Sequence, residues 1–453
     1  MRSKRRFNGS APGAGLSRRQ FVQTAAALGL GVGLAQIDGA GPRAAWAAPA
    51  DQLSGAVEFW SRETADNGAR QPLVAAHLAA FDAANGTKST PQYMVFQESI
   101  QKMQAALAAG SPPEVGQQGP DVTMQFAAAG HLQPLDDVLT TIGRDRFAPL
   151  GSEAYVVRDG VTYSIPWYIE TRVLYYHKDL LAQAGVNPPT TWAEWVDAAK
   201  ALTNADQIGY AVPMEGTNPG QLFVPLGISN GGSVLDQNGK VVVNSAPMRE
   251  ALEYVTGFYT QHQTMSEASL TYKNAELFQL FLLKKIAMIT FNGELYRNVR
   301  TQTPELADTV GAVTIPVNRP GDITRSFLGG WQLFAFKNSK NLAAGLELLK
   351  WLYDDAWYTD YMVRTEGSAL PVMKSTLSLP FYTDDPIRKV LIEQEQTAVR
   401  YSGPYVGVQP FMGEAEGKLL FSQAVTDVVN GKKSVGEALT TLESQIKQLA
   451  GQA

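Results

Sequence analysis

An acidic residue at the end of an apolar and aromatic run is the position in this sequence best suited to chemistry. Residues 165–169, Ile-Pro-Trp-Tyr-Ile, have the β-branched and aromatic composition of a buried strand, and Glu170 follows them directly. An unpaired charge inside a core is costly, so Glu170 either pairs within the protein or faces a cleft. Its carboxylate can accept several hydrogen bonds from hydroxyl groups, and the rings of Trp167 and Tyr168 have flat apolar faces suited to stacking on a sugar ring.

Two carboxylates in this part of the chain also have a structural interpretation. Glu170 lies two residues before Arg172, and an ion pair with Arg172 or another nearby residue is the alternative to ligand contact, which we favour. Asp121 follows a Gly-Pro pair, so its side chain suits either the cap of a helix that begins at Val122 or a position facing the cleft. Both interpretations of Asp121 stay open.

The composition describes an ordinary globular protein whose charge is unevenly distributed. The chain has 453 residues, of which 45% are hydrophobic and 18% are charged. It is therefore long enough for roughly two or three domains of about 150 residues. Residues 1–47 contain seven basic residues and one acidic residue, and the remainder has 31 basic and 42 acidic residues, a net charge of −11. This acidic remainder argues against nucleic acid or an anionic membrane as a partner.

Several kinds of chemistry are excluded by residue types and motifs that the sequence lacks. It contains no cysteine, which excludes disulfides, thiol catalysis, thiolate metal sites and a lipid anchor on cysteine. No glycine-rich phosphate-binding motif is present, and the histidines lie too far apart to form a metal-binding pair. We therefore expect no metal ion and no cofactor. The four histidines are His77, His131, His177 and His262.

The N-terminus has the ordered features of an export signal. Residues 17–22, Ser-Arg-Arg-Gln-Phe-Val, have the form of a twin-arginine motif, and a mild apolar segment covers residues 24–37. That segment is too short and too rich in glycine to span a bilayer. Ala45-Trp46-Ala47 provides a small-x-small cleavage site. We expect residues 1–47 to be a signal peptide that the twin-arginine export machinery recognises and that is removed near Ala47.

Strand and helix patterns alternate in the remainder of the chain. The sequence predicts strands at residues 56–60 and 92–96, and helices at residues 73–84 and 100–107. This alternation is typical of an α/β fold with helices covering a parallel or mixed sheet.

Two later helices have clear start signals. Thr191 with Glu194, and Ser434 with Glu437, have the spacing of a capping box, in which each side chain satisfies a backbone N–H of the first turn. The first of these helices has two tryptophans on its apolar face, which we assign to the core.

Five segments carry a family pattern by their order and spacing. They are 59–61 (Phe-Trp-Ser), 110–115 (Gly-Ser-Pro-Pro-Glu-Val), 129–136 (Ala-Gly-His-Leu-Gln-Pro-Leu-Asp), 174–180 (Leu-Tyr-Tyr-His-Lys-Asp-Leu) and 329–331 (Gly-Gly-Trp). Together they resemble the extracellular solute-binding proteins of ABC importers, in the carbohydrate-binding family that includes maltose-binding protein. The resemblance covers almost all of residues 55–450.

The resemblance implies a two-lobed α/β fold of the type II periplasmic-binding-protein class, with a hinge that the chain crosses several times. The ligand would lie between the lobes. We expect the N-terminal lobe to comprise residues 50–168 with 332–370, and the C-terminal lobe to comprise residues 170–330 with 371–453.

The resemblance also assigns candidate ligand-binding residues. Glu170 and Asp121 match ligand-contacting acid positions, and the other candidates stand at or beside strand ends or loops near the cleft. The family's Asn-Gly-Pro-Trp is Asn-Gly-Glu-Leu at residues 292–295, so a stacking tryptophan is missing, and Glu294 or Tyr296 would compensate. This departure argues against maltodextrin itself but not against a sugar ligand. The remaining candidates are Trp60, Trp167, Tyr168, Gly330, Trp331 and Glu98.

The implied function is that of a soluble, exported, monomeric receptor in the periplasm that binds a mono- or oligosaccharide and delivers it to an ABC permease. It would perform no chemistry. The alternative from another class is a glycoside-processing enzyme with Asp121 and Glu170 as its acid and base. A second alternative keeps the fold but binds glycerol phosphate, which would need converging arginines such as Arg62, Arg172 or Arg364, or a polyamine, which would need further acids.

Overall fold

A computed structural model describes residues 53–62, 70–148 and 155–452 of the chain. The predicted signal peptide, residues 1–47, lies outside the described residues. Among the described residues, no helix is long and apolar enough to cross a membrane.

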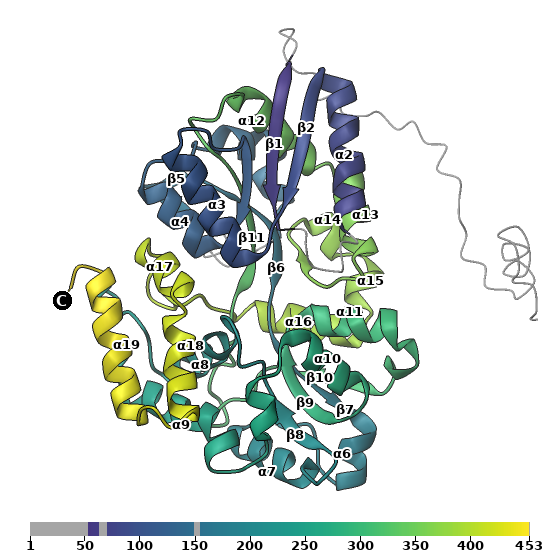
Figure 1. Cartoon of the computed structure of the whole chain (residues 1–453). Coiled ribbons are helices and arrows are strands. Elements are labelled where there is room, and N and C mark those ends of the chain that lie inside the picture. Colours follow the sequence, from purple (N-terminus) through teal and green to yellow (C-terminus); the bar gives the residue numbers. More distant parts are fainter. Residues whose placement is uncertain (1–52, 63–69, 149–154, 453) are drawn as a thin grey trace, which may run out of the picture. The chain divides into compact units, whose positions relative to one another are not determined.

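The first sheet has six strands in the order β12-β6-β11-β3-β1-β2. Figure 1 labels β1, β2, β6 and β11 of this sheet. Strand β1 pairs in parallel with β2 and β3, whereas β11 is antiparallel to β3 and β6, and β12 is antiparallel to β6. The sheet is therefore mixed. Its strands are β1 Gly55–Ser61, β2 Thr87–Tyr93, β3 Val115–Gln118, β6 Ile165–Glu170, β11 Gly329–Ala335 and β12 Leu370–Pro371.

The second sheet has four strands in the order β10-β7-β9-β8. Strand β8 is parallel to β9, and β7 is antiparallel to both β9 and β10. Two mixed sheets connected by helices confirm the predicted α/β class. The strands are β7 Val173–His177, β8 Ile208–Ala211, β9 Ile286–Phe291 and β10 Val310–Val313, and a separate hairpin is formed by β4 Val157–Arg158 and β5 Val161–Thr162.

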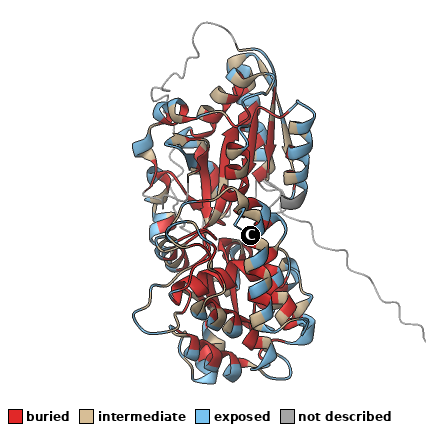
Figure 2. Cartoon of the chain, turned by 90° about the vertical axis from the view of Figure 1, so that its left-hand side faces the viewer, coloured by how far each residue is buried: buried red, intermediate tan, exposed pale blue. Residues whose placement is uncertain are grey.

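The helices that lie with the six-stranded sheet are α2 Arg70–Asn85, α3 Phe96–Ala108, α4 Pro120–Ala128, α5 Asp136–Ile142, α12 Leu342–Leu352, α13 Asp355–Arg364 and α14 Lys374–Leu377 (Figure 1). Helix α15 Pro380–Thr383 contacts α16. The other helices are α6 Lys178–Ala184, α7 Trp192–Leu202, α8 Asn218–Ser229, α9 Ala246–Thr260, α10 Asn274–Leu282, α11 Gly293–Gln302, α16 Pro386–Glu395, α17 Phe411–Gly417, α18 Leu420–Val429 and α19 Val435–Leu449. Buried residues follow the strands of both sheets (Figure 2).

The core is explained by the pattern of apolar residues along the central strands. Strand β9, Ile-Ala-Met-Ile-Thr-Phe, is buried at all six positions, as expected for a strand with neighbours on both edges and helices against it. Both predicted capping boxes are confirmed at the starts of α7 and α19. The tryptophans of α7 are buried in the core, as predicted.

One predicted strand was wrong in its position. The sequence favoured residues 92–96, but β2 is Thr87–Tyr93 and Phe96 already begins α3. Strand β2 lies at the edge of its sheet and pairs with β1 alone, so its polar sequence, Thr-Lys-Ser-Thr-Pro-Gln-Tyr, needs no buried face. An edge strand also tolerates Pro91, because one row of its backbone groups faces away from any ladder.

The chain passes between the two sheets at more than one place. It crosses at residues 171–172 between β6 and β7, and it returns between β10 and β11. Ser326 Oγ accepts a hydrogen bond from the Arg172 backbone N–H at 3.0 Å and donates one to the Arg172 carbonyl at 2.7 Å. The Leu328 N–H donates to the carbonyl of Val399 at 2.9 Å. The Ser326 hydroxyl and a backbone hydrogen bond therefore join separate crossing segments side by side.

A buried arginine fixes the same region. Arg400, 2% exposed, donates to the Leu328 carbonyl at 2.7 Å, forms an ion pair with fully buried Asp121, and lies 3.6 Å from Glu416. Its guanidinium stands 4.6 Å from the centre of the Phe327 ring. Asp121 is on α4 and Glu416 is on α17, so one cation joins helix ends from two parts of the fold to the start of β11.

This geometry corrects one of the interpretations of Asp121. The N-cap of α4 is Gly119, with no side-chain cap hydrogen bond, and the Asp121 carboxylate is used by Arg400 instead. Close packing supports the arrangement, because a Cβ at Gly413 of α17 would lie 2.7 Å from the Asp121 carbonyl oxygen.

We expect Asp121→Ala to lower the free energy of unfolding by about 3 kcal/mol, because the buried guanidinium of Arg400 loses its nearest carboxylate and is left with Glu416 at 3.6 Å. Urea denaturation of the purified protein measures this. The matched control is Asp137→Ala on α5, where the side chain is exposed and the change should stay within about 0.5 kcal/mol. Equal effects of the two substitutions would contradict the assigned role.

Two histidines are held neutral by burial. His77 stacks on Trp357 with ring centroids 3.9 Å apart and its Nε2 donates to the Trp351 carbonyl at 3.0 Å. His177 stacks on Phe281, whose carbonyl accepts from Nε2 at 2.9 Å. Loss of hydration lowers the pKa of each imidazole to about 4, although the hydrogen bond to the carbonyl opposes the shift.

The unfolded chain therefore binds a proton at each histidine between about pH 6.5 and pH 4, where the folded protein does not. We therefore expect the free energy of unfolding to fall as the pH drops from about 6.5 towards 4, by up to about 3 kcal/mol per histidine. His77→Gln should reduce this slope by about one proton in urea titrations over that range. A slope in the His77→Gln variant equal to that of the unchanged protein would contradict this role of His77.

Candidate ligand-binding site

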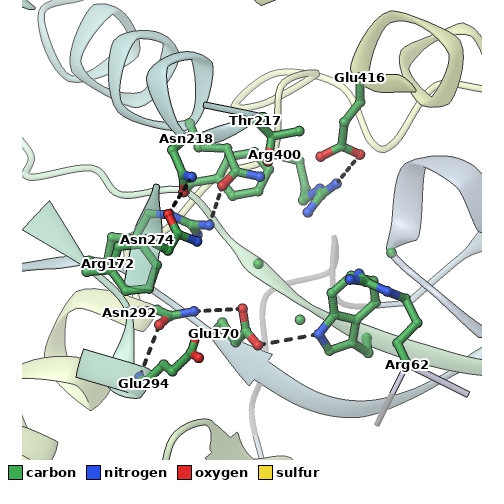
Figure 3. A pocket seen from close by; sticks show the side chains of 18 of the residues that line it. Arg62, Glu170, Arg172, Thr217, Asn218, Asn274, Asn292, Glu294, Arg400 and Glu416 are labelled. Atoms are coloured by element: carbon green, nitrogen blue, oxygen red, sulfur yellow. Dashed lines mark hydrogen bonds and ion pairs between the residues drawn. The ribbon is translucent and has the colours of Figure 1, made fainter. Parts of the chain in front are cut away.

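A pocket of about 360 Å³ lies where residues attached to the two sheets meet (Figure 3). Its volume is within the range typical of small-molecule sites. Strands β6 and β11 of the six-stranded sheet supply one group of lining residues, and the loops and helix starts that follow strands of the four-stranded sheet supply another.

On the six-stranded sheet, Glu170 and Trp331 form a connected pair. Glu170 ends β6 and faces β11 across an antiparallel ladder, where the Trp331 indole Nε1 donates to Glu170 Oε1 at 3.4 Å. Gly330 has φ of +119°, and a Cβ there would lie 2.4 Å from the Tyr168 carbonyl oxygen, so glycine is required for this approach. The Arg62 guanidinium lies over the Trp331 ring at 3.8 Å.

On the other side, three helices begin at the pocket, and each presents an asparagine. Asn218 is the first residue of α8, Asn274 is the first residue of α10, and Asn292 is the N-cap of α11. Asn218 Nδ2 donates to Asn274 Oδ1 at 3.2 Å. Asn292 accepts from the Glu294 backbone N–H at 3.0 Å and donates to Glu170 Oε2 at 3.0 Å (Figure 3). Neutral amides and the positive ends of helix dipoles therefore face the pocket.

The hydrogen bond between Glu170 and Asn292 joins the two sheets directly. Glu170 belongs to β6, and Asn292 follows β9 of the other sheet. The carboxylate thus accepts hydrogen bonds from neutral donors on both sides, Trp331 and Asn292.

Arginine is also present in the pocket wall. Arg172 donates through Nη2 to Gln221 Oε1, and its guanidinium lies 5.1 Å from the centre of the Phe327 ring. Burial lowers the pKa of Arg172, and the nearby Glu170 carboxylate opposes that shift. Arg400 lines the same pocket together with Glu416.

Five of the predicted residues line the pocket, namely Tyr168, Glu170, Glu294, Gly330 and Trp331. Their roles as ligand contacts stay predictions. Glu294 lies 3.6 Å from Arg297 on the next turn of α11. Tyr296, suggested as its alternative, is buried and donates to Asp385 at 2.7 Å, so it serves packing on that side of the helix.

The other four predicted residues lie elsewhere in the fold. Trp167 is 1% exposed and packs among aromatic rings with centroids 5.2 to 5.8 Å away, because strand alternation turns it from the side that Tyr168 faces. Trp60 is 8% exposed and donates to Glu58 at 3.0 Å. Asp121 is fully buried against Arg400, and Glu98 is exposed on α3 and paired with Lys102 at 2.7 Å.

Sequence reasoning missed most of the polar wall. Thr217, Asn218 and Gln221 belong to the start of α8 and Asn274 to the start of α10, and no spacing links either segment to Glu170. The available signal was local, because an Asn-Pro step at 218–219 is typical of a helix start. Arg62 was identified only for the phosphate-binding alternative, and Arg172 for that alternative and as the alternative ion-pair partner of Glu170.

The pocket offers hydrogen-bonding groups and no arrangement for metal chemistry. Among the residues that the structure describes, no three carboxylate or histidine side chains form a group that could hold a metal ion. Amides, a carboxylate and an indole ring are suited to hydroxyl-bearing ligands with apolar faces.

Comparisons with known proteins agree with this architecture. A family model described as bacterial extracellular solute-binding protein matches residues 61–359. A probable ABC transporter-binding protein of Deinococcus radiodurans is 26% identical over 318 residues, which cover 64% of this chain and 70% of that protein. The diacetylchitobiose-binding protein of Streptomyces coelicolor is 29% identical over 287 residues, which cover 61% of this chain and 65% of that protein.

Among solved structures, a sugar transporter protein from Arthrobacter chlorophenolicus with bound laminaribiose has the same fold. The TM-score is 0.78 at 22% identity, and the match covers 87% of this chain and 99% of that one. Because the family model matches more than half of the sequence and the fold agrees, the chain belongs to the bacterial extracellular solute-binding proteins, which are non-enzymatic ligand-binding components of ABC transporters.

Proposed function

We propose that the protein is an exported receptor that binds a mono- or oligosaccharide in the pocket and delivers it to the membrane subunits of an ABC importer. The observation that carries this proposal is the pairing of Trp331 and Glu170 with a wall of asparagine side chains. An indole beside a carboxylate offers an apolar face and an acceptor, and the amides offer both donors and acceptors, as hydroxyl groups require.

The names of related proteins support a carbohydrate ligand. The relative from Streptomyces coelicolor binds diacetylchitobiose, and solved structures with the same fold contain laminaribiose or maltose. Identity of 22% to 29% supports the ligand class rather than one particular sugar.

Hinge closure is the proposed mechanism. The proposed N-terminal lobe comprises residues 50–168 with 332–370, and the proposed C-terminal lobe comprises residues 170–330 with 371–453. A ligand that contacts Trp331 on one side and the asparagines on the other favours the closed arrangement by its differential affinity. The permease then recognises that arrangement.

Export through the twin-arginine pathway completes the proposal. Residues 17–22 and the cleavage site at Ala45-Trp46-Ala47 support removal of residues 1–47, which leaves a soluble, monomeric, periplasmic or otherwise extracytoplasmic receptor.

Two alternative functions, a glycoside-processing enzyme and a polyamine receptor, fit the pocket less well than a carbohydrate receptor does. The glycoside-processing enzyme is contradicted by the family assignment, and Asp121, its proposed partner for Glu170, is fully buried in an ion pair. A polyamine receptor would need several uncommitted acids, but two of the four acids that line the pocket already have cationic neighbours, because Glu416 lies beside Arg400 and Glu294 beside Arg297.

We expect a carbohydrate panel in thermal-shift measurements to identify a ligand that raises the melting temperature in proportion to its concentration. With that ligand, Trp331→Ala and Glu170→Ala should each weaken binding by about 30-fold or more, the size expected of a central contact residue. Both variants should keep the unliganded melting temperature within a few degrees.

The matched controls are Tyr405→Ala, at an exposed aromatic position outside the pocket lining, and Glu98→Ala, at an exposed acid. Both controls should bind normally. Unchanged affinity in the Trp331 and Glu170 variants would contradict the assignment of the binding site. If no sugar in the panel raises the melting temperature, the proposed ligand class is wrong.

A further inference from the structure

Two of the three arginines named for an anionic ligand lie in the pocket wall. Arg62 and Arg172 both line it, whereas Arg364 is on α13, is exposed, and pairs with Asp360 at 2.7 Å. The same wall also contains the carboxylates of Glu170, Glu215, Glu294 and Glu416, so the charge that a ligand meets depends on which of these groups are already paired.

The carboxylates of the pocket do not neutralise Arg172. Glu416 lies 3.6 Å from Arg400, which also pairs with Asp121. Glu294 lies beside Arg297, and Glu170 accepts from the neutral donors Trp331 and Asn292. Among the described residues, no carboxylate lies within ion-pair distance of Arg172.

Of the two terminal nitrogens of Arg172, one has a hydrogen-bond acceptor and the other has none among the described residues. Nη2 donates to the neutral Gln221, while Nη1 is buried and has no hydrogen-bond partner among the described residues. A buried charged N–H without an acceptor is costly, so an acceptor oxygen in this position would be strongly favoured. The adjacent pocket residue is Gly329, where a Cβ would lie 3.2 Å from Nη1, so glycine keeps a side chain away from this nitrogen.

The opposite wall favours negative charge as well. Helices α8, α10 and α11, which have 12, 9 and 10 residues, all begin at residues that line the pocket or lie next to such residues. The positive ends of their dipoles and their first backbone N–H groups act together with Arg172 on any charge placed between them.

We propose that the ligand is a sugar or polyol that carries an oxyanion, either a carboxylate or a phosphate, and that Arg172 is the residue that selects it, with Arg62 adding a second positive charge. This inference rests on the proposed function, because the hydroxyl groups of the same ligand would use Trp331, Glu170 and the asparagines. A guanidinium fork pairs with a carboxylate or phosphate through two parallel hydrogen bonds, which a neutral hydroxyl group cannot match.

Matched pairs of neutral and acidic compounds test the proposal by calorimetry and thermal shift on the full chain. The pairs are glucose with glucuronate, galactose with galacturonate, glucose with glucose 6-phosphate, and glycerol with glycerol 3-phosphate. We expect the acidic member of at least one pair to bind about 10-fold or more tightly than its neutral partner, and to weaken as salt is added. The uronate and phosphate arms distinguish the two sources of the oxyanion.

For the preferred acid, Arg172→Gln should weaken binding by about 10- to 100-fold, with a much smaller effect on the neutral partner. Arg172→Lys should restore part of the loss, because it keeps the charge but not the fork. Arg364→Gln is the matched control and should bind as the unchanged protein does. If Arg172→Gln fails to fold, Arg62→Gln provides the second variant, with an expected loss of salt dependence.

The two proposals fail in different ways. Neutral sugars that bind as tightly as their acids, or an acid whose affinity is the same in the Arg172 and Arg62 variants, would overturn the selection of an oxyanion and leave the carbohydrate receptor intact. If neither neutral nor acidic carbohydrates bind, the proposed function itself is wrong.

Discussion

The buried cation of Arg400 is the interaction on which the geometry of the pocket depends. Its guanidinium holds Asp121 of α4, Glu416 of α17 and the carbonyl of Leu328, three points that are distant in sequence. A charge removed from water is tolerated only where partners surround it, so these segments are constrained to meet at one place. The segment that leads into β11 is thereby fixed, and β11 carries Gly330 and Trp331 to the pocket.

From that fixed point, the binding surface is divided between two kinds of structure. The six-stranded sheet contributes side chains from rigid strand ends, where the ladder between β6 and β11 sets the distance between Glu170 and Trp331. The four-stranded sheet contributes helix starts, where backbone N–H groups lack partners within the helix and asparagine is favourable. One wall therefore offers an apolar ring and an acceptor, and the other offers donors and positive dipole ends.

The electrostatics of the pocket follow from which charges are already paired. Asp121 and Glu416 neutralise Arg400. Arg172 instead donates a hydrogen bond to the neutral Gln221, and the Glu170 carboxylate acts on it only beyond ion-pair distance. A count of acids and bases in the sequence does not reveal this difference, because it depends on distances of a few ångströms between separate segments. The acidic net charge of the whole chain is therefore compatible with a site that attracts an oxyanion.

The sequence by itself determined the α/β class and the two capping boxes, because these depend on neighbouring residues and on periodicity. It also predicted the strand at 56–60 and the helices at 73–84 and 100–107, which lie within β1, α2 and α3. It also pointed to Glu170, since a carboxylate at a strand end is unusual in a core, and the family resemblance added Trp331; both line the pocket. Local signals failed for β2, whose polar edge position has no apolar pattern.

Only the tertiary structure decided which candidates share a surface. Trp167 and Tyr168 are adjacent in sequence, yet the alternation of a strand sends one into the aromatic core and the other to the pocket wall. Asp121 was read as a cap or a ligand contact, but a cation 279 residues away in the chain takes its carboxylate. Asn218, Asn274 and Asn292 come together because three helices begin at one place. Packing between segments that are distant in sequence cannot be predicted from the spacing of residues along the chain.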